Sequence, residues 1–429
     1  MSNQDLIKFF LQIALMLGCA LVMGQTMRRF RQPSVLGELI GGILLGPTIL
    51  GWLFPDFFEW LFQSSLEVGI LRDASIKMGM LFFLFIAGLE INFSNTNHVG
   101  RYAFFIGLFG TILPIAFGVG LVYLLPSALW GPIAQKNLII FGLFIGINLA
   151  NTANPVIIRI LQDLGLLKKE IGLITLNATV IDDSITWTLF AIMLSFTHRP
   201  QAGEISLGAD QTIFLILSFF ILMLTFGRRF APQALRFIRK SVSWPSGFIA
   251  FTTLAILLVA SVAEFLGIHA FLGAFLLGAV VAGKHPEAEQ AHTVISQFVM
   301  AFFAPIYFVS IGMKTNFIIN FDFTLLTVIL LSAIVSKFLS VLLGAKIAGM
   351  KINRRVFAIA SGLNARGATG IILAGIGLSN GLIDERIFVS LFITAIITSV
   401  AAGPLMTYFL GEKKSISLTE NDPSISTIQ

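Results

Sequence analysis

Two adjacent carboxylates, Asp182 and Asp183, lie inside an apolar run that extends over about 171–196. They are the only ionisable residues in 173–193, and a helix of that length holds them near the middle of a lipid bilayer. One Asp at that depth costs roughly 2.5–3.5 kcal/mol, so a pair is kept against a substantial cost. The pair therefore predicts a binding site for a cation or for protons.

The spacing of the two carboxylates limits how they can act. Neighbouring residues on a helix diverge by about 100°, so Asp182 and Asp183 need separate partners. Two close carboxylates titrate as a coupled pair, which suits the exchange of protons for a cation. Thr179 lies one turn before Asp183 on the same face and offers a hydroxyl ligand. The alternative is a purely structural pair of buried carboxylates.

Lys337 is the cationic counterpart of this pair, because it lies about sixteen residues into an apolar span expected at 322–346. We expect its ammonium group to pair with one of the two carboxylates, since an unpaired charge at that depth is costly. We favour Asp182 as the partner, which leaves Asp183 for the transported ion. The alternatives are a static ion pair and a lysine that reaches the membrane surface with its long side chain.

The composition is that of a membrane protein. Of its 429 residues, 56% are hydrophobic and 12% are charged, whereas soluble domains carry roughly 25% charged residues. The mean hydropathy is +0.90. We therefore predict an all-α polytopic membrane protein embedded in a lipid bilayer. About thirteen spans are expected, at roughly 5–25, 33–53, 74–92, 101–125, 136–161, 170–196, 211–228, 246–265, 268–283, 293–314, 322–346, 354–378 and 386–410.

The basic residues predict the orientation of the chain. One set of alternate loops holds most of the Lys and Arg residues, including Arg28, Arg29, Lys351 and Arg354, and the other set holds few. By the positive-inside rule the first set is cytoplasmic, which places the N-terminus outside and the C-terminus inside. Because the net charge of +6 lies in these short loops, it indicates topology and no nucleic-acid partner.

Three short motifs recur in the same order in the two halves of the chain, at 35–42 and 271–278, at 88–93 and 312–317, and at 146–148 and 362–364. We predict one transmembrane domain over 1–410, made of repeat one at about 5–196, a linker helix at about 211–240 and repeat two at about 246–410. A short cytoplasmic tail follows at 411–429. An odd number of spans separates equivalent segments, so the second repeat is expected to be inverted.

Each predicted repeat contains a helix that is interrupted by polar residues. The fifth span carries Asn151, Asn154 and Pro155, and its counterpart in the twelfth carries Asn364 and Arg366. Proline removes a backbone donor and disfavours helix at the preceding residue. Inverted repeats bring such broken helices together at the midplane, where free carbonyl groups and helix ends suit a cation. We expect the guanidinium of Arg366 to satisfy some of those carbonyl groups.

Several chemistries are absent from the sequence. It contains no ATPase-type phosphate-binding loop, no His-Glu-x-x-His motif and no Gly-x-Ser-x-Gly motif. Its single cysteine, Cys19, excludes a disulfide within the chain. We therefore predict that the protein is no enzyme and uses no cofactor beyond the transported ions.

Six features together resemble the monovalent cation:proton antiporter family, in the group that contains bacterial sodium/proton antiporters and potassium-efflux antiporters. They are the Asp182–Asp183 pair, Lys337, and the segments 36–47 (LGELIGGILLGP), 83–90 (FLFIAGLE), 152–156 (TANPV) and 364–367 (NARG).

The resemblance implies a homodimer, with a dimerisation domain and a six-helix core in which broken helices cross, and an elevator-like movement of that core. It implies that Asp183 binds the monovalent cation and the proton, that Asp182 and Lys337 form a charge pair, and that Thr152 and Thr179 supply oxygen ligands. It also implies electrogenic exchange and a location in a bacterial inner membrane.

The sequence thus predicts a secondary antiporter that exchanges Na⁺, or K⁺ or Li⁺, for H⁺. Competition of both ions for one carboxylate supplies the coupling, provided that the site crosses only when it is occupied. Three alternatives stay open: a potassium-efflux antiporter or channel gated by a regulatory subunit, a non-transporting membrane sensor, and a sodium-coupled carrier of organic solutes.

Overall fold

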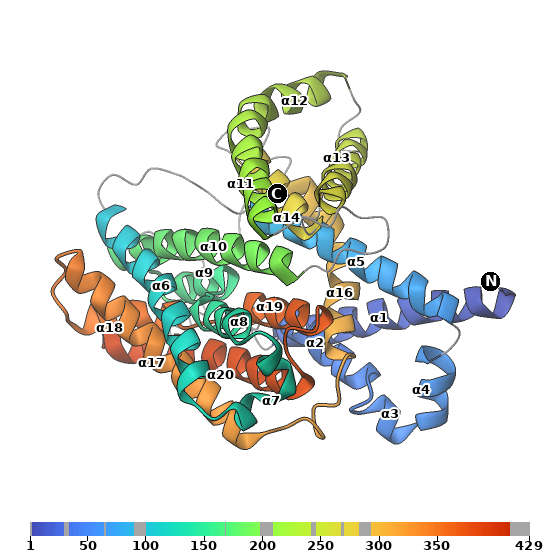
Figure 1. Ribbon diagram of the computed structural model, residues 1–429, viewed down its shortest axis with the longest axis horizontal. Helices are drawn as coiled ribbons and strands as arrows, with labels where there is room; N and C mark the ends of the chain where they lie inside the picture. The colour runs from blue at the N-terminus through green and yellow to red at the C-terminus, as the bar shows by residue number, and fades with distance from the viewer. Residues whose placement is uncertain are drawn as a thin grey trace, which may run out of the picture.

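The chain forms helices throughout the part that the computed structural model describes, which comprises residues 2–29, 34–63, 66–89, 100–167, 169–197, 209–241, 246–266, 270–282 and 293–411 (Figure 1). In this part, seven helices are long and apolar enough to cross a membrane: Asn3–Arg29, Ser34–Leu53, Gly100–Leu124, Ser246–Phe265, Thr293–Gly312, Phe323–Ile347 and Glu385–Leu410. An eighth span results if the pair Ser127–Lys136 and Leu138–Ala150, bent by 113°, counts as one.

The expected number of thirteen spans therefore exceeds what length and composition support in the described residues. Each expected span does contain helix, but several of these helices are short or carry charges. The helix Leu138–Ala150, with 13 residues, extends about 20 Å and cannot cross a bilayer core of about 30 Å alone. The remaining spans stay a prediction, because a broken helix spans the bilayer only if its two halves together make up one span.

One group of helices, here called the core bundle, packs around α10 and α6 (Figure 1). Within it, α6 packs against α8, α10 and α17, and α20 packs against α17, α18 and α19. The members of the core bundle are α6 (Gly100–Leu124), α8 (Leu138–Ala150), α9 (Asn154–Asp163), α10 (Glu170–Thr197), α17 (Phe323–Ile347), α18 (Arg354–Leu363), α19 (Gly367–Ser379) and α20 (Glu385–Leu410).

A second group, here called the scaffold bundle, is built on the pairs α1–α2, α2–α16, α5–α14 and α13–α14. It touches the core bundle sparsely, chiefly where α14 meets α10 and where α2 and α16 meet α19. Its members are α1 (Asn3–Arg29), α2 (Ser34–Leu45), α5 (Leu66–Leu89), α13 (Ser246–Phe265), α14 (Ala270–Val281), the π-helical turn η2 (Val299–Phe303) and α16 (Ala304–Gly312).

The remaining helices connect these groups. Helix α11 (Ala209–Leu222), the π-helical turn η1 (Met223–Gly227) and α12 (Arg228–Ser241) run from α10 to α13, and Figure 1 shows α11, α12 and α13 projecting together at one end. The short helix α3 (Leu50–Leu53) ends the span expected at 33–53, and two short helices, α4 (Pro55–Phe62) and α7 (Ser127–Lys136), lie where the sequence suggested loops. Proline at the first position of α4 pre-sets the helical φ angle and starts the helix.

Glycines set two close helix crossings in the scaffold bundle. Gly42 of α2 faces Gly312 of α16, and Gly88 of α5 faces Gly278 of α14, and at each of the four a Cβ atom would overlap a backbone carbonyl of the facing helix. Only glycine permits backbones to approach this closely. Each crossing joins one motif from the first half of the chain to one from the second half, as two copies related by a two-fold axis would do. The inverted repeat itself stays a prediction.

The interrupted helices meet in the core bundle. Helix α8 ends at Ala150 and α9 begins at Asn154, while α18 ends at Leu363 and α19 begins at Gly367. The amide of Ala153 in the first break donates a hydrogen bond to the carbonyl of Ala365 in the second, with an N–O distance of 2.7 Å. Gly367 has φ +48°, and a Cβ there would lie 2.7 Å from the Ala153 side chain. The two breaks therefore cross in direct contact.

Candidate cation and proton site

Asp182 of α10 lies at this crossing and is 1% exposed. The ammonium group of Lys337 from α17 lies 2.8 Å from its Oδ2 atom. The hydroxyl of Thr111 from α6 donates to Oδ1 at 2.6 Å, and the hydroxyl of Thr152 donates to Oδ2. Both carboxylate oxygens therefore have close donors from three other segments, which offsets the cost of burying the charge.

Lys337 is as deeply buried as its partner, with 1% of its surface exposed. Besides Asp182, its ammonium group donates to the carbonyl of Gly110, at 3.0 Å, and to the carbonyl of Ala150. An ammonium group has three donor hydrogens, so these contacts use all of them. Lys337 thus ties α6, the end of α8 and α10 to α17.

Arg366 occupies the second break and is 3% exposed. Its guanidinium donates to five oxygens: the carbonyl groups of Asn148 at 3.3 Å, Leu149 at 2.6 Å, Ala333 at 2.9 Å and Asn364 at 3.2 Å, and the side-chain oxygen of Asn364 at 2.8 Å. The last turn of a helix leaves its carbonyl groups without partners inside that helix. Arg366 supplies those partners at the end of α8.

The charges at the crossing match the polarity of the helix ends. The C-terminal end of α8, which carries the partial negative charge of the helix dipole, faces the cations Lys337 and Arg366. The N-terminal end of α9, which carries the partial positive charge, begins at Asn154 and meets Asp183 through the Asn154 amide group. The break between α8 and α9 therefore presents opposite partial charges to the two sides of the site.

Asp183 has different surroundings from those of Asp182. It is half-buried, and its Oδ2 atom accepts a hydrogen bond from the amide nitrogen of Asn154. Two buried amide oxygens in the first break, those of Asn154 and Asn151, have no hydrogen-bond partner among the described residues. The amide nitrogen of Asn151 donates to Thr369 at 2.9 Å. Carboxylate and amide oxygens together form the ligand set that a hard cation prefers.

No group of three or more His, Cys, Asp or Glu side chains lies close enough to hold a metal ion in the part of the chain that the structure describes. The oxygen atoms around Asp183 therefore offer few formal charges. Such a site suits a monovalent cation better than a divalent one, because divalent sites gather several carboxylates. The predicted cation ligand Asp183 lies in surroundings compatible with that role.

The other residues singled out in the sequence fall as follows. Thr179 is fully buried on α10, and its hydroxyl donates to the carbonyl of Leu176 in the same helix at 2.8 Å, so its role as a cation ligand stays a prediction. Pro155 lies in the first turn of α9, where its missing amide hydrogen costs nothing. Asn364 is buried and holds Arg366.

Three hydroxyl groups of the site were missed by sequence reasoning. Thr111 donates to Asp182, Thr186 lies 3.5 Å from the same carboxylate, and Thr369 accepts from Asn151. Thr186 could have been found, because it follows Asp182 by four residues and therefore shares its face of α10. No spacing in the sequence relates Thr111 on α6 to Asp182 on α10.

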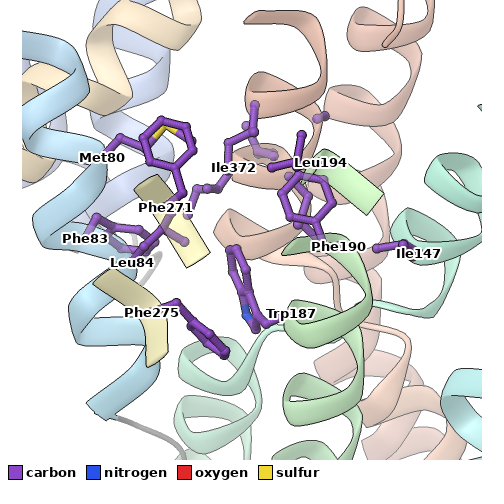
Figure 2. Close-up of a cluster of buried hydrophobic side chains, with 14 of the residues drawn as sticks. Met80, Phe83, Leu84, Ile147, Trp187, Phe190, Leu194, Phe271, Phe275 and Ile372 are labelled. Atoms are coloured by element: carbon purple, nitrogen blue, oxygen red, sulfur yellow. The ribbon is translucent and has the colours of Figure 1, made fainter. Parts of the chain in front are cut away.

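An apolar contact closes the space between the core bundle and the scaffold bundle (Figure 2). Trp187, Phe190 and Leu194 of α10 face Phe271 and Phe275 of α14, and the rings of Trp187 and Phe275 lie 6.0 Å apart. The space enclosed by these side chains and their neighbours is only about 10 Å³, and it has no polar lining. We call this contact the aromatic seal. An opening this small and apolar does not admit a hydrated ion.

A larger cavity of about 770 Å³ adjoins the aromatic seal, and Phe271 lines both. Its polar wall includes Asp73, Glu264, Lys314 and Ser379. The ammonium group of Lys314, in the loop after α16, donates to the hydroxyl of Ser379 on α19. Lys314 is exposed on the cavity wall, where partial desolvation lowers its pKa to about 8 and the charge of Asp73 opposes this shift. The cavity therefore brings charged groups close to the seal.

The fold and the site define a class of protein: an integral, multi-pass helical membrane protein that buries an ion pair where two interrupted helices cross. The family model described as "Sodium/hydrogen exchanger, transmembrane" matches residues 13–411. The chain belongs to this family of monovalent cation/proton antiporters, which are transporters and not enzymes. The family expected from the sequence motifs is thereby confirmed.

Individual relatives agree with this assignment. The Na(+)/H(+) antiporter NhaS4 of Synechocystis sp. is 30% identical over 409 residues, which cover 95% of this chain and 98% of that protein. The Na(+)/H(+)-K(+) antiporter GerN of Bacillus cereus is 29% identical over 95% of this chain and 97% of that protein. The sodium proton antiporter MjNhaP1 from Methanocaldococcus jannaschii has a similar fold, with a TM-score of 0.67 at 15% identity, over 95% of this chain and 100% of that one.

Proposed function

We propose that the protein exchanges Na⁺ or K⁺ for H⁺ and that Asp183 is the group for which the two ions compete. The observation that carries this proposal is the contrast between the two carboxylates. Asp182 is enclosed by Lys337, Thr111 and Thr152, whereas Asp183 is only half-buried. Asp183 also lies beside the positive end of α9, which favours a negative charge there.

Competition at one carboxylate accounts for coupled exchange. A cation and a proton cannot both neutralise Asp183, so each displaces the other. The half-buried carboxylate is costly to move through an apolar region while charged, which restricts the crossing step to the occupied forms. Exchange then follows without a direct interaction between the two ions.

Electrogenic exchange follows if Asp182 also takes part. With a cation at Asp183 and the Asp182–Lys337 pair intact, the charges at the site sum to zero. With protons on both carboxylates and Lys337 still charged, they sum to +1. A cycle that alternates between these two forms moves two protons against one cation and transfers one net charge. The direct contact between Lys337 and Asp182 supports this role, since protonation of Asp182 would break the pair.

The ion preference rests on the relatives and on the ligand set. NhaS4 is named as a Na(+)/H(+) antiporter and GerN as a Na(+)/H(+)-K(+) antiporter. The amide oxygens of Asn151 and Asn154 in the adjacent break have no hydrogen-bond partner among the described residues, and neutral amide oxygens can bind Na⁺, K⁺ or Li⁺. We therefore propose Na⁺ as the first ion to test and K⁺ as the second.

Alternating access is proposed to involve the aromatic seal. Trp187 follows Asp183 by one turn of α10, on the side that the positive-inside rule makes external. The seal thus separates Asp183 from the external cavity around Lys314. Sparse contacts between the core and scaffold bundles support a sliding, elevator-like movement of one past the other that would open this seal.

We further propose that the chain has thirteen membrane spans arranged as two inverted repeats. We also propose that it forms a homodimer and lies in a bacterial inner membrane.

The experiment uses proteoliposomes with an imposed pH gradient, to which Na⁺, K⁺ or Li⁺ is added in turn. The expected result is that wild-type protein dissipates the gradient on addition of at least one cation and that Asp183→Asn does not. Asp322→Asn is the matched control, because Asp322 caps α17 far from the site. Gradients unaffected by every cation, in folded wild-type protein, would overturn the proposal and favour a gated or sensory role.

A further inference from the structure

A cavity of about 370 Å³ lies in the scaffold bundle, where α1 faces α2 and the stretch from η2 to α16. The residues of α1 that line it recur at spacings of three and four, so they form one face of that helix. They are Leu17, Ala20, Leu21, Gly24, Gln25 and Arg28. The cavity is separate from the crossing that holds Asp182 and Asp183, and the proposed exchange does not use it.

The lining of this cavity changes from apolar to polar along α1. Leu17 and Leu21 are followed by Gln25 and Arg28, and Arg28 adjoins a loop of the predicted cytoplasmic set. At 1.5 Å per residue, Leu17 lies about 16 Å deeper than Arg28. Leu21 is 65% exposed and Met300 is 41% exposed, so the cavity opens on the apolar outer surface of the bundle. This order of polarity matches a lipid whose headgroup lies at the inner surface of the membrane.

Two opposite charges line the cavity from different helices. Glu38 of α2 is only 9% exposed, whereas Arg28 of α1 is exposed. Arg28 is close enough for its charge to act on the Glu38 carboxylate, which also has the hydroxyl of Ser34 beside it. No ion pair engages Arg28 or Glu38 within the described ranges of the chain. Glu38 is therefore a nearly buried carboxylate without a counter-charge in contact, which is a costly arrangement.

The two charged side chains lean toward the same level of the membrane. Helices α1 and α2 run antiparallel, with close contacts of Gly37 to Met23 and of Gly41 to Cys19. Because the side chains of a helix lean toward its N-terminus, Arg28 leans into the membrane and Glu38 leans toward the cytoplasmic surface. A Cβ at Gly24, one turn before Arg28, would lie 3.7 Å from the Cγ atom of Glu38. The guanidinium and the carboxylate therefore flank the same part of the cavity.

We propose that this cavity binds phosphatidylethanolamine, with its phosphate on Arg28, its primary ammonium group on Glu38 and an acyl chain along Leu17 and Leu21. A guanidinium offers paired donors that match phosphate oxygens, and a primary ammonium group offers three donors to a carboxylate. Phosphatidylglycerol would leave Glu38 without a counter-charge. The quaternary ammonium group of phosphatidylcholine has no N–H donor. The pair of opposite charges thus selects a headgroup that carries both a phosphate and a primary amine.

The test adds phosphatidylethanolamine, phosphatidylcholine or phosphatidylglycerol to the purified, delipidated full chain and counts bound lipids by native mass spectrometry. Wild-type protein is expected to bind phosphatidylethanolamine about 10-fold more tightly than either of the other two, because only this headgroup donates charge-assisted hydrogen bonds to Glu38. Equal binding of the three lipids would overturn the proposal.

Two charge variants separate the contacts of the headgroup. Glu38→Gln should abolish the preference for phosphatidylethanolamine over phosphatidylcholine and leave binding of phosphatidylcholine unchanged. Arg28→Gln should weaken binding of all three lipids about 10-fold, because each carries a phosphate. The matched controls are Glu170→Gln and Arg29→Gln, at exposed residues on the same predicted side that do not line the cavity. A preference that survives in Glu38→Gln, or binding unchanged in Arg28→Gln, would overturn the proposal.

A third variant tests the cavity independently of charge. Ala301→Phe places a ring in the cavity from an exposed lining position, and Val22→Phe is its control, because Val22 is 62% exposed on α1 and does not line the cavity. Loss of phosphatidylethanolamine binding in Ala301→Phe alone supports the site. A change of oligomeric state in Ala301→Phe with lipid binding intact would show that a second copy of the chain covers the cavity, and would overturn the proposal.

Discussion

Asp182 and Asp183 are neighbours in the chain but occupy opposite surroundings. Asp182 is 1% exposed and receives donors from Lys337, Thr111 and Thr152. Asp183 is half-buried and faces the amide group of Asn154 at the start of α9. The 100° between adjacent residues of a helix suffices to turn one carboxylate into the protein and the other toward the break between α8 and α9.

The contrast teaches how one helix can hold one carboxylate paired with a buried lysine and one carboxylate open to a transported ion. Two of the donors to Asp182, Thr111 and Lys337, are anchored on α6 and α17 and cannot leave without moving whole helices, while the third, Thr152, lies in the break between α8 and α9. Asp183 accepts a hydrogen bond from the amide group of Asn154, the first residue of α9, which adjoins the break. A cation can displace such a donor at small cost, because an amide group also offers an oxygen ligand.

The largest expected effect follows removal of the fixed partner. Lys337→Met leaves Asp182 buried without a counter-charge, and this should cost about 3–5 kcal/mol of folding stability. Thermal unfolding in detergent measures it, with Lys346→Met as the control, because Lys346 is an exposed residue in the last turn of the same helix. Equal stability of the two variants would show that Asp182 is not held by Lys337.

Replacing both partners sharpens this result. The double variant Asp182→Leu and Lys337→Met removes both charges and fills similar volume, so it should recover most of the stability that Lys337→Met loses. The same unfolding assay reports the outcome. A double variant as unstable as Lys337→Met would mean that the loss comes from packing of the lysine stem or its carbonyl contacts, and not from the charge of Asp182.

A smaller effect is expected from removing a threonine hydroxyl group near either carboxylate. Thr111→Val removes a donor from the buried carboxylate and should cost about 1–3 kcal/mol. Thr179→Val should cost less, because its hydroxyl donates only within its own helix. Midpoints of thermal unfolding compare the two. A larger loss for Thr179→Val would indicate a ligand role for Thr179 that its hydrogen bond does not suggest.

Asn154→Ala tests the surroundings of Asp183, the carboxylate proposed to bind the transported ion. The variant removes both the donor to Asp183 and a buried amide oxygen, so the cation concentration for half-maximal exchange should rise about 2- to 10-fold with little loss of stability. Exchange assays in proteoliposomes measure this value. Asn177→Ala is the matched control, because the Asn177 amide donates to Leu173 within α10. An unchanged value for Asn154→Ala would remove Asn154 from the site.

The smallest effect is expected at Lys314, which follows the candidate span Thr293–Gly312, because its side chain is exposed and solvent screens its charge. The folded-state pKa of Lys314 is lowered to about 8, below the ordinary value of 10.5, so the unfolded chain binds the proton more tightly. Stability of the wild type should therefore rise relative to Lys314→Met between pH 8 and pH 10.5 and be level below pH 8. Unfolding midpoints across this range test the sign, and a decrease would contradict it.

Much of the site could be predicted from the sequence, because its chemistry is locally encoded. A charged pair within 173–193, a lysine deep in an apolar span and polar breaks with proline or glycine are each visible in short windows. Placing such residues in a bilayer costs free energy, so their presence in an apolar span indicates a functional site. The count of spans was less predictable, since the sequence marks apolar stretches but not whether each forms one long helix or two halves.

The sequence by itself determined that the chain lies in a lipid bilayer and which charged residues lie inside its apolar spans. What the tertiary structure decided is which groups meet. The pairing of Lys337 with Asp182, 155 residues away, and the contacts of Arg366 with the end of α8, 217 and 218 residues away, depend on how helices cross. Helical periodicity fixes the face of each helix, but only packing in three dimensions fixes its neighbour.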